Sequence, residues 1–241
     1  MASMKKYQVI ADKIRERILS GVYPPKTMIP DQKQFAEEFD VSMITVKKAL
    51  DGLAREGLIY KKSGLGTFVL GKIPLGGAYD SPANAFDGLS AQQGAEHVQS
   101  VPLRFELAFP TADVAQKLDC KTSEPVYDIL RLRKLNGKPF ILEHTYMLVR
   151  LVPDLTKEIL SASIYEYMHK DLKLVFGGAY RKIHASEPTA QDQQYLNAGE
   201  HTPMLEVEQV VWLANGENVE YSTSRNVFDQ RSYTVIDVND F

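Results

Sequence analysis

The sequence predicts an α+β protein of two domains, an N-terminal winged helix-turn-helix domain and a C-terminal domain built on a mainly antiparallel sheet. Three observations support this prediction. Residues 5–53 contain three amphipathic helical patterns, a Gly-containing hairpin follows them, and from residue 101 onward strand patterns outnumber helical ones. The length of 241 residues suits one or two domains, since a typical domain takes about 100–200 residues.

The N-terminal part begins with two expected helices. An apolar stripe over residues 5–19 predicts the first helix, and Gly21 is placed to end it. The second helix is expected over Gln32–Phe39, where Asp31 and Gln34 form a plausible capping box. These short, capped patterns are typical of a compact helical domain.

A third helix and a hairpin complete this domain. Ser42 is placed to cap the third helix, and Gly57 is placed to end it. Two β-prone runs, Leu58–Tyr60 and Thr67–Leu70, then flank the loop Lys61–Gly66. Two helices joined by a short turn and followed by such a hairpin predict a winged helix-turn-helix domain with lysines at the tip of its wing.

The charge of the chain is divided unevenly between its two parts. The whole chain has a formal net charge of −3. Residues 5–72 contain 13 Lys/Arg and 8 Asp/Glu, which gives +5, whereas the remainder contains 15 and 23, which gives −8. A basic first domain is expected to be attracted to DNA phosphates, while the acidic second domain is repelled from them.

The first domain resembles the GntR family of bacterial transcription regulators. The matching positions are Ile18, Gly21, Tyr23-Pro24, Ile29-Pro30, Phe35-Ala36, Phe39, Val41-Ser42, Thr45-Val46, Ala49-Leu50, Leu53, Glu56-Gly57-Leu58-Ile59 and Gly64-x-Gly66-Thr67-Phe68-Val69. The resemblance implies that the third helix and the wing contact double-stranded DNA. The chain departs from the family at Pro25-Lys26, at Asp31-Gln32, and at Met43 and Lys47, where the family usually has arginines.

These departures bear on which DNA sequence is read. Arginine binds guanine O6 and N7 through two hydrogen bonds, whereas methionine offers only apolar contact and lysine a point charge. We therefore expect an operator that differs from the family's common one. The expected DNA-binding residues are Lys33, Ser42, Met43, Thr45, Lys47, Lys48, Lys61, Lys62, Gly64, Gly66 and Thr67.

The domain boundaries are expected in a segment rich in Gly and Pro, residues 71–83. We assign residues 1–72 to the first domain, 73–83 to a linker and 84–241 to the second domain. Residues 84–100 are polar and are expected to form a loop or a lid over a ligand. Further helices are predicted at Thr111–Leu118, Asp154–Leu160, Ile164–Leu172 and Thr189–Asn197, and strands at Leu103–Phe109, Val126–Leu135, Pro139–Val149, Ala179–Glu187, Met204–Leu213, Val219–Val227 and Tyr233–Val238.

Two arginines in one predicted strand suggest a site for an anion. Arg131 and Arg133 alternate with leucines, so their guanidinium groups share one face of the sheet. A three-residue loop, Asn136-Gly137-Lys138, would place Arg131 opposite Glu143, whereas a two-residue Asn-Gly turn would send Glu143 to the other face. We expect the longer loop, because it pairs the charge of Glu143. The alternative to an anion site is an Arg–Glu cross-strand pair on a solvated sheet face.

The second part of the chain, from about Val101, resembles the UTRA effector domain of the HutC subfamily, which is similar in fold to chorismate lyase. The motifs that carry the resemblance are RLRKLNGKPFILEHTYM at 131–147, Ser161-x-Ser163-Ile164-Tyr165 and Val219-Glu220-Tyr221-Ser222. The resemblance implies a ligand pocket built from paired arginines, two glutamates and a Ser-x-Tyr step. The expected ligand-binding residues are Phe86, Asp87, Ser90, Arg131, Arg133, Glu143, Ser163, Tyr165, Glu220 and Ser222.

One departure affects the expected ligand, a small anionic metabolite such as a sugar phosphate or an organic acid. Members of the family that bind sugar phosphates tend to have Ser-Phe-Ser/Thr in the loop after the linker, but this chain has Ala85-Phe86-Asp87. A carboxylate repels phosphate unless it faces away or accepts from a hydroxyl or an amine. Ser90 is an alternative source of the hydroxyl, and Phe86 is a suitable wall for a sugar ring.

The expected function is that of a ligand-responsive repressor that binds a palindromic operator as a homodimer, since one reader per chain contacts little DNA. A chorismate-lyase-like enzyme fused to a DNA-binding domain is one alternative, and a winged-helix protein-interaction module is another. No metal site is expected, because the five histidines lack ligand spacing, and no catalytic residues or cofactor are expected either. A single cysteine and the lack of a long apolar run favour a cytoplasmic protein without membrane contact.

Overall fold

The computed structural model describes residues 6–71, 80–83 and 88–235. The chain forms two compact units, one containing residues 6–71 and the other containing residues 80–83 and 88–234. Each unit has its own hydrophobic core. Most of the predicted linker, residues 73–79, lies outside the described residues.

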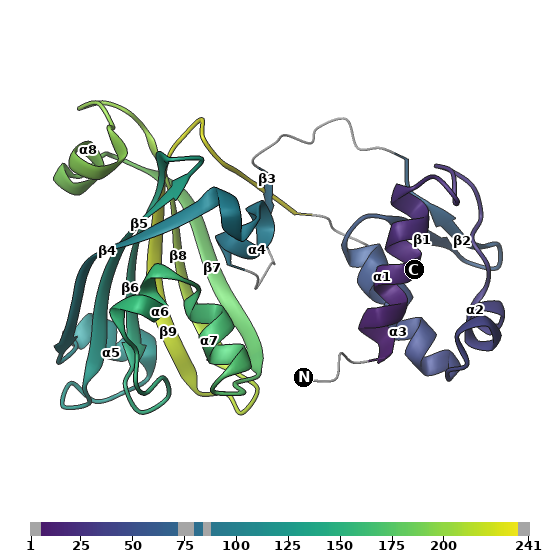
Figure 1. The fold of residues 1–241 in the computed structure, drawn as a ribbon, viewed down its shortest axis with the longest axis horizontal. Helices are drawn as coiled ribbons and strands as arrows, with labels where there is room; N and C mark the ends of the chain where they lie inside the picture. Colours follow the sequence, from purple (N-terminus) through teal and green to yellow (C-terminus); the bar gives the residue numbers. More distant parts are fainter. Residues whose placement is uncertain (1–5, 72–79, 84–87, 236–241) are drawn as a thin grey trace. The chain divides into compact units, whose positions relative to one another are not determined.

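The first unit is a winged helix-turn-helix domain (Figure 1). Its elements are α1 (Lys6–Leu19), α2 (Gln32–Phe39), α3 (Met43–Arg55), β1 (Ile59–Lys62) and β2 (Gly66–Val69). Asp31 and Gln34 form the predicted capping box on α2, and the Ser42 side chain accepts from the N–H of Thr45 at the start of α3. The helices pack around the fully buried Phe35 and Leu50. The predicted architecture of this domain is confirmed.

The second unit is an antiparallel α+β domain, as predicted (Figure 1). Its elements are β3 (Asp80–Pro82), α4 (Leu89–Gln93), the 3₁₀ turn η1 (Ala95–His97), β4 (Val98–Ala108), α5 (Ala112–Leu118), β5 (Val126–Leu135), β6 (Lys138–Leu148), α6 (Lys157–Ser161), α7 (Ile164–Lys170), β7 (Phe176–Ser186), α8 (Ala190–Leu196), β8 (Met204–Leu213), β9 (Asn218–Val227) and β10 (Ser232–Thr234). Six of the strands form one sheet in the order β4-β5-β6-β9-β8-β7.

Helices cover both faces of this sheet, and the two cores follow the alternation of side chains along β5. Ile129 packs with Leu160 of α6 and Met168 of α7 on one face. The next residue, Leu130, packs with Leu196 of α8 on the other face. Because alternate residues point to opposite sides, the arginines of β5 lie on the same face as α6 and α7.

The turn between β5 and β6 differs from the prediction, although the predicted register is confirmed. The turn has two residues, Asn136 and Gly137, with φ of 50° and 78°, which suit a type I′ hairpin. The strands nevertheless pair Arg131 with Glu143, because the register shifts between Arg133 and Lys134. This shift is a β-bulge in which Phe140 is the extra residue. The bulge returns Glu143 to the face of the sheet that carries Arg131, whereas the two-residue turn alone would place it on the other face.

A short parallel pair joins two segments that are distant in the sequence. β3 pairs with β10, with Ser81 opposite Tyr233. The predicted strand Tyr233–Val238 is confirmed at Tyr233 and Thr234, where β10 ends, and residues 236–238 lie outside the described residues. The predicted loop over residues 84–100 is also partly wrong, because α4, η1 and the first residues of β4 occupy its described part.

At one edge of the sheet, Trp212 of β8 packs closely over β7. A Cβ atom on Gly178 would overlap the indole ring, and one on Gly177 would lie 2.6 Å from the carbonyl oxygen of Leu213. Two adjacent glycines therefore allow the backbone of β7 to approach Trp212, beside a register shift between Phe176 and Gly178. The ring is half-buried rather than enclosed in the core.

Candidate functional site

The first candidate surface lies on α3, whose apolar face is buried in the domain core. The opposite face carries Met43 and Ile44, which are 53% and 70% exposed, together with Lys47 and Lys48, which are also exposed. This face therefore combines lysines, which can contact phosphates, with apolar side chains, which can contact thymine methyl groups. This arrangement suits insertion of the helix into the major groove of DNA.

The wing and α2 flank the start of α3. Lys33, Met43 and Thr67 line one open groove, which Gly66 also borders. A second groove lies along α3, where Thr45 and Lys48 are accompanied by Lys6 of α1. The structure thus brings predicted DNA-binding residues from three elements to one surface.

The two wing lysines have different surroundings. Lys61 forms an ion pair with Asp51 of α3. The Nζ of Lys62 instead lies 5.2 Å from the ring centroid of Phe68 and 5.7 Å from that of Tyr60. Lys62 therefore keeps an uncompensated charge among the described side chains, whereas the charge of Lys61 is partly neutralised.

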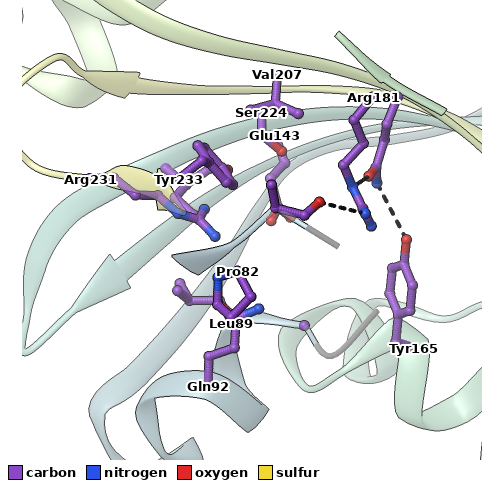
Figure 2. Close-up of a pocket in the computed structure, with 14 residues that line it drawn as sticks. Pro82, Leu89, Gln92, Glu143, Tyr165, Arg181, Val207, Ser224, Arg231 and Tyr233 are labelled. Atoms are coloured by element: carbon purple, nitrogen blue, oxygen red, sulfur yellow. Dashed lines mark hydrogen bonds between the residues drawn. The ribbon is translucent and has the colours of Figure 1, made fainter. Parts of the chain in front are cut away.

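The second candidate site is a small cavity of about 100 Å³ between the sheet and the segments that cover it (Figure 2). Its described lining residues are Pro82, Ala83, Gly88, Leu89, Gln92, Ile141, Glu143, Tyr165, Arg181, Val207, Gln209, Ser224, Arg231 and Tyr233. They come from β3, α4, α7, four strands of the large sheet and the C-terminal segment.

The predicted pair of arginines surrounds Glu143. The Nη2 of Arg131 donates to Glu143 Oε2 at 2.7 Å, and its Nη1 donates to the carbonyl oxygen of Leu160 at 3.1 Å. Arg133 Nη1 lies 3.6 Å from the same carboxylate oxygen, and its Nη2 donates to Ser90 Oγ at 3.0 Å. Burial opposes ionisation of Glu143, but the two guanidinium groups outweigh it and hold the pKa of Glu143 below its ordinary value.

A chain of hydrogen bonds leads from Glu220 to Arg181. Glu220 Oε1 accepts from Ser222 Oγ at 2.7 Å and from Gln209 Nε2 at 2.8 Å, and Gln209 Oε1 accepts from Arg181 Nε at 2.9 Å. Gln209 Nε2 also lies 3.4 Å from the hydroxyl oxygen of Tyr165. Burial raises the pKa of Glu220 despite these hydrogen bonds, so this carboxyl group binds its proton unusually tightly.

Arg231 enters the cavity from the C-terminal segment. Its Nη2 and Nε donate to Ser81 Oγ at 2.9 Å and 3.1 Å, and its guanidinium carbon lies 4.6 Å from the ring centroid of Tyr233. These partners are neutral, and burial lowers the pKa of Arg231. In Figure 2, Arg231 and Arg181 reach the cavity on either side of Glu143.

The structure sorts the eight predicted ligand-binding residues that it describes into three groups. Glu143 and Tyr165 line the cavity. Behind its wall lie the residues that contact the lining or each other, namely Ser90, Arg131, Arg133, Glu220 and Ser222. Ser163 caps α7 by accepting from the N–H of Glu166, so its hydroxyl is used within the helix. Phe86 and Asp87 lie outside the described residues.

The sequence reasoning missed Arg181, Gln209 and Arg231. Arg181 and Gln209 face each other in the β7–β8 register, and alternation within the predicted strands was the available signal for both. Arg231 follows β9 in a short irregular segment, and no periodic pattern marks it.

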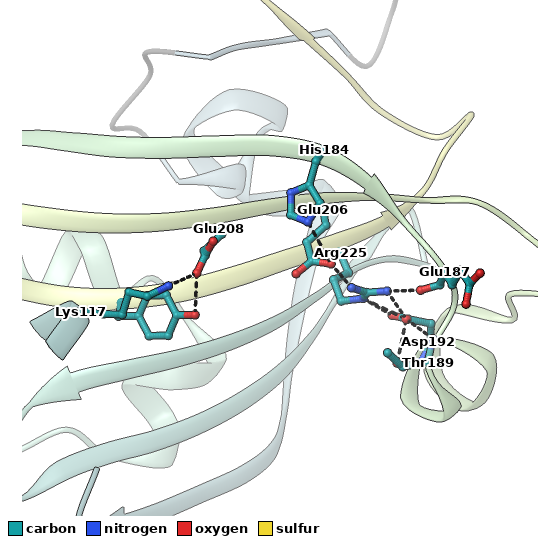
Figure 3. A network of polar contacts seen from close by, with 9 residues as sticks. Lys117, His184, Glu187, Thr189, Asp192, Glu206, Glu208 and Arg225 are labelled. Carbon is teal, nitrogen blue, oxygen red and sulfur yellow. Dashed lines mark hydrogen bonds and ion pairs between the residues drawn. The ribbon is translucent and has the colours of Figure 1, made fainter. Parts of the chain in front are cut away.

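A second polar network lies on the other face of the sheet (Figure 3). Arg225 pairs with Asp192 at 2.9 Å and with Glu206, and it donates to the carbonyl oxygen of Glu187 at 2.7 Å. Asp192 is fully buried and also forms the capping box of α8 with Thr189. The network fixes α8 to the sheet, and its one guanidinium faces two carboxylates, so it offers no excess of positive charge to an anion.

The described residues contain no group of three His, Cys, Asp or Glu side chains arranged to hold a metal ion. None of their helices is long and apolar enough to cross a membrane.

Comparison with known proteins assigns both domains. Residues 6–69 match the family described as bacterial regulatory proteins, gntR family, and residues 92–230 match the UTRA domain. The solved structure of the possible transcriptional regulator YydK from Bacillus subtilis superposes with a TM-score of 0.80 and 26% identity, covering 97% of this chain and all of that one.

Two curated relatives extend over nearly the whole chain. The HTH-type transcriptional regulator GmuR of Bacillus subtilis is 38% identical, covering 98% of this chain and 99% of the relative. The mannosyl-D-glycerate transport/metabolism system repressor MngR of Escherichia coli is 30% identical, covering 94% and 92%. These relatives are transcription regulators and not enzymes, which decides against the chorismate-lyase-like enzyme. The chain belongs to the GntR family of helix-turn-helix transcription regulators, in the group whose second domain is an effector-binding UTRA domain.

Proposed function

We propose that the protein represses transcription by binding a palindromic operator as a homodimer, and that a small anionic carbohydrate derivative in the cavity of the second domain changes its affinity for DNA. Sugar phosphates and sugar acids are the two ligand classes that fit. The excess of positive charge around the cavity is the observation that carries this proposal.

Arg181 and Arg231 line the cavity, and Arg131 and Arg133 lie directly behind Glu143. Glu143 is the one carboxylate among the described lining residues. Glu220, the other nearby carboxyl group, has a raised pKa and so compensates less charge than an ordinary glutamate. An anion would balance the remaining guanidinium charge and accept charge-assisted hydrogen bonds.

The rest of the lining suits a sugar. Tyr165, Gln209 and Ser224 offer groups that hydrogen-bond to hydroxyls, and Ile141, Leu89 and Val207 offer apolar contact. The name of the relative MngR refers to mannosyl-D-glycerate, a sugar linked to a carboxylic acid. A ligand of this size needs more room than about 100 Å³, since pockets for small molecules span roughly 300–1,000 Å³. We therefore expect the covering segments, β3 and α4, to move when the effector binds.

Dimerisation follows from the size of the reading surface. One winged helix contacts too little DNA for a specific site, and two copies related by a two-fold axis would read two half-sites. Sedimentation equilibrium of the full chain should give a mass near twice 27.1 kDa. A monomer that binds a single half-site with full affinity would contradict this part of the proposal.

The effector is tested by titrating the natural promoter fragment with protein in the presence of added ligands. The ligands are compared in pairs, each consisting of a neutral sugar or glycoside and the corresponding sugar phosphate or sugar acid. We expect at least one charged member to change operator affinity by about 5- to 150-fold, the usual range of allosteric coupling, while its neutral partner has no effect. A response to neutral sugars alone would refute the anionic ligand.

A further inference from the structure

We infer that Arg231 and Arg181 receive the anionic group of the effector, and that Ser81 and Ala83 occupy these two guanidinium groups until the anion arrives. The inference rests on the proposed function, because it takes this cavity as the effector site. It adds the residues that meet the anion and a competition between the effector and the segment containing β3.

The two arginines predicted from the sequence are already engaged. The two terminal nitrogens of Arg131 donate hydrogen bonds to Glu143 and to the carbonyl oxygen of Leu160, and the residue is 5% exposed. Arg133 is 4% exposed and contacts Glu143 and Ser90. Neither is among the described residues that line the cavity. Their charges support an anion through the field they create, but direct contact requires a guanidinium in the wall.

Arg231 meets this requirement. It lines the cavity, and its described partners are a hydroxyl and an aromatic ring. A hydrogen bond from guanidinium to an anion is roughly twice as strong as one between neutral groups, and the pairing can be bidentate. An oxyanion beside Arg231 therefore competes effectively with the Ser81 hydroxyl for the same Nε and Nη2 atoms.

Arg181 approaches from the other side with a fixed orientation. Its Nε is directed to Gln209, whose amide is in turn oriented by Glu220. This arrangement aims the end of the guanidinium at the covering segment, where Nη1 donates to the carbonyl oxygen of Ala83 at 2.9 Å. Gln209 and Glu220 are thus positioning residues, and Arg181 is the residue that contacts the anion.

Both arginines contact the same short segment. Ser81 and Ala83 flank Pro82, which itself lines the cavity, and the N–H of Ala83 donates to the carbonyl oxygen of Thr234 at 2.8 Å beside the β3–β10 pair. An anion that takes both guanidinium groups removes two of the contacts that fix β3. Inorganic phosphate is smaller than a sugar phosphate, so its binding requires less of the space that this segment fills.

Calorimetric titration of the full chain with inorganic phosphate, at constant ionic strength, tests the inference. Arg231→Gln should weaken phosphate binding by about tenfold, because a charge-assisted contact is lost. Ser81→Ala should strengthen phosphate binding by about threefold, because it removes the competing acceptor. Arg150→Gln is the matched control, since Arg150 lies on the same domain and pairs with Glu124 and Glu217. Phosphate bound by the first domain contributes equally to all variants.

The opposite signs of the two effects separate binding from folding, since a purely structural contact between Arg231 and Ser81 would make both variants weaker. Absence of phosphate binding by the unmodified chain would overturn the inference, and so would equal affinity in the Arg231→Gln and Arg150→Gln variants. Unchanged or weaker binding by Ser81→Ala would overturn the competition. The operator titration distinguishes failure of this inference from failure of the proposed function. A compound that shifts operator affinity equally in the Arg231→Gln and Arg150→Gln variants refutes the inference and leaves the proposed function standing.

Discussion

The side-chain amide of Gln209 donates to Glu220, with Nε2 lying 2.8 Å from Oε1, and this contact turns the amide oxygen of Gln209 toward Arg181. An isolated glutamine can rotate its amide by half a turn at little cost. Here the carboxyl group on one side and the guanidinium on the other allow only one orientation. The carboxyl group of Glu220 is therefore linked, through Gln209, to the position of Arg181 in the wall of the candidate cavity.

The first prediction concerns Glu220→Gln and pH. Burial raises the pKa of Glu220 in the folded chain, so this group stabilises the fold fully below its unfolded pKa, about 4.3, and the contribution is lost as pH rises through the folded pKa. The variant should therefore gain thermal stability relative to the unmodified chain as pH rises from about 4.3. Melting temperatures of the variant and the unmodified chain, measured at a series of pH values above about 4.3, test this prediction.

Glu143→Gln is the matched control with the opposite sign. Its two arginines outweigh burial and lower the pKa of Glu143, so its contribution is present above the unfolded pKa and lost as pH falls through the folded pKa. The deficit of this variant should be largest near neutral pH and should shrink in acid. A constant difference for either variant would contradict the assigned charge states.

The second prediction concerns the response to the effector. Arg133 contacts Glu143 beside the cavity and also holds Ser90 of α4, so it supports both the charge of the site and its cover. Arg133→Ala should abolish the change in operator affinity caused by the effector. Titration with operator, with and without the effector, measures this loss, and a melting curve checks that the domain remains folded. A full response in a folded Arg133→Ala variant would remove the paired arginines from the mechanism.

The third prediction concerns the wing. Lys61→Ala should weaken binding to all DNA sequences about equally and lower the salt slope by roughly 1, as expected for one phosphate contact. Asp51→Asn should act in the other direction, because it frees Lys61 from its ion pair. Filter-binding or anisotropy titrations at several salt concentrations provide the slopes. If Asp51→Asn weakens DNA binding, the ion pair itself positions the lysine for contact.

The fourth prediction concerns the bases that are read. Met43 is 53% exposed at the first position of α3. Met43→Arg should introduce a preference for guanine at one position of each half-site, worth about 1–3 kcal/mol for a bidentate contact. Selection from a randomised operator library compares the two proteins. A variant that binds every sequence more tightly by the same factor would show that residue 43 faces a phosphate.

The fifth prediction concerns the edge of the sheet. The methyl group added by Gly178→Ala would overlap atoms of the Trp212 ring. This change should lower the free energy of unfolding of the second domain by about 1–3 kcal/mol, the usual range for overpacking. Gly52→Ala in α3 provides the contrast, because no atom of the described residues, apart from its chain neighbours and the local helix backbone, lies within 4 Å of its added Cβ. That change should stabilise the first domain by roughly 0.5–1 kcal/mol through helix propensity. Chemical denaturation of each variant gives both values.

Local patterns predicted the elements well, because the signals lie within each element. The bounds of β5 and β8 agree with prediction, since their alternation ends where turn residues begin. Thr111, Ser163 and Thr189, which belong to residue types that favour the start of a helix, cap α5, α7 and α8. The predicted pairing of Arg131 with Glu143 is confirmed, but the three-residue loop from which it was predicted is not present. A bulge at Phe140 instead compensates for a shorter turn.

Such patterns can assign Arg181 to one face of its strand, but they do not bring it together with the other residues of the cavity. Arg181 lies on β7, which β8 and β9 separate from β6 in the sheet. Arg231 reaches Ser81 only because β10 pairs with β3, a parallel contact between segments about 150 residues apart. Contacts that depend on the closure of the whole domain leave no periodic trace in the sequence.

Trp212, which packs over Gly178, is the single tryptophan of the chain and belongs to the second unit. Its fluorescence therefore reports on that unit alone. Because each unit has a separate core, a denaturation experiment followed by tryptophan emission isolates the unfolding of the effector domain, whereas far-ultraviolet circular dichroism records both units. Any ligand that stabilises only the second unit should separate the two transitions, and the emission curve then serves as an effector screen that requires no DNA.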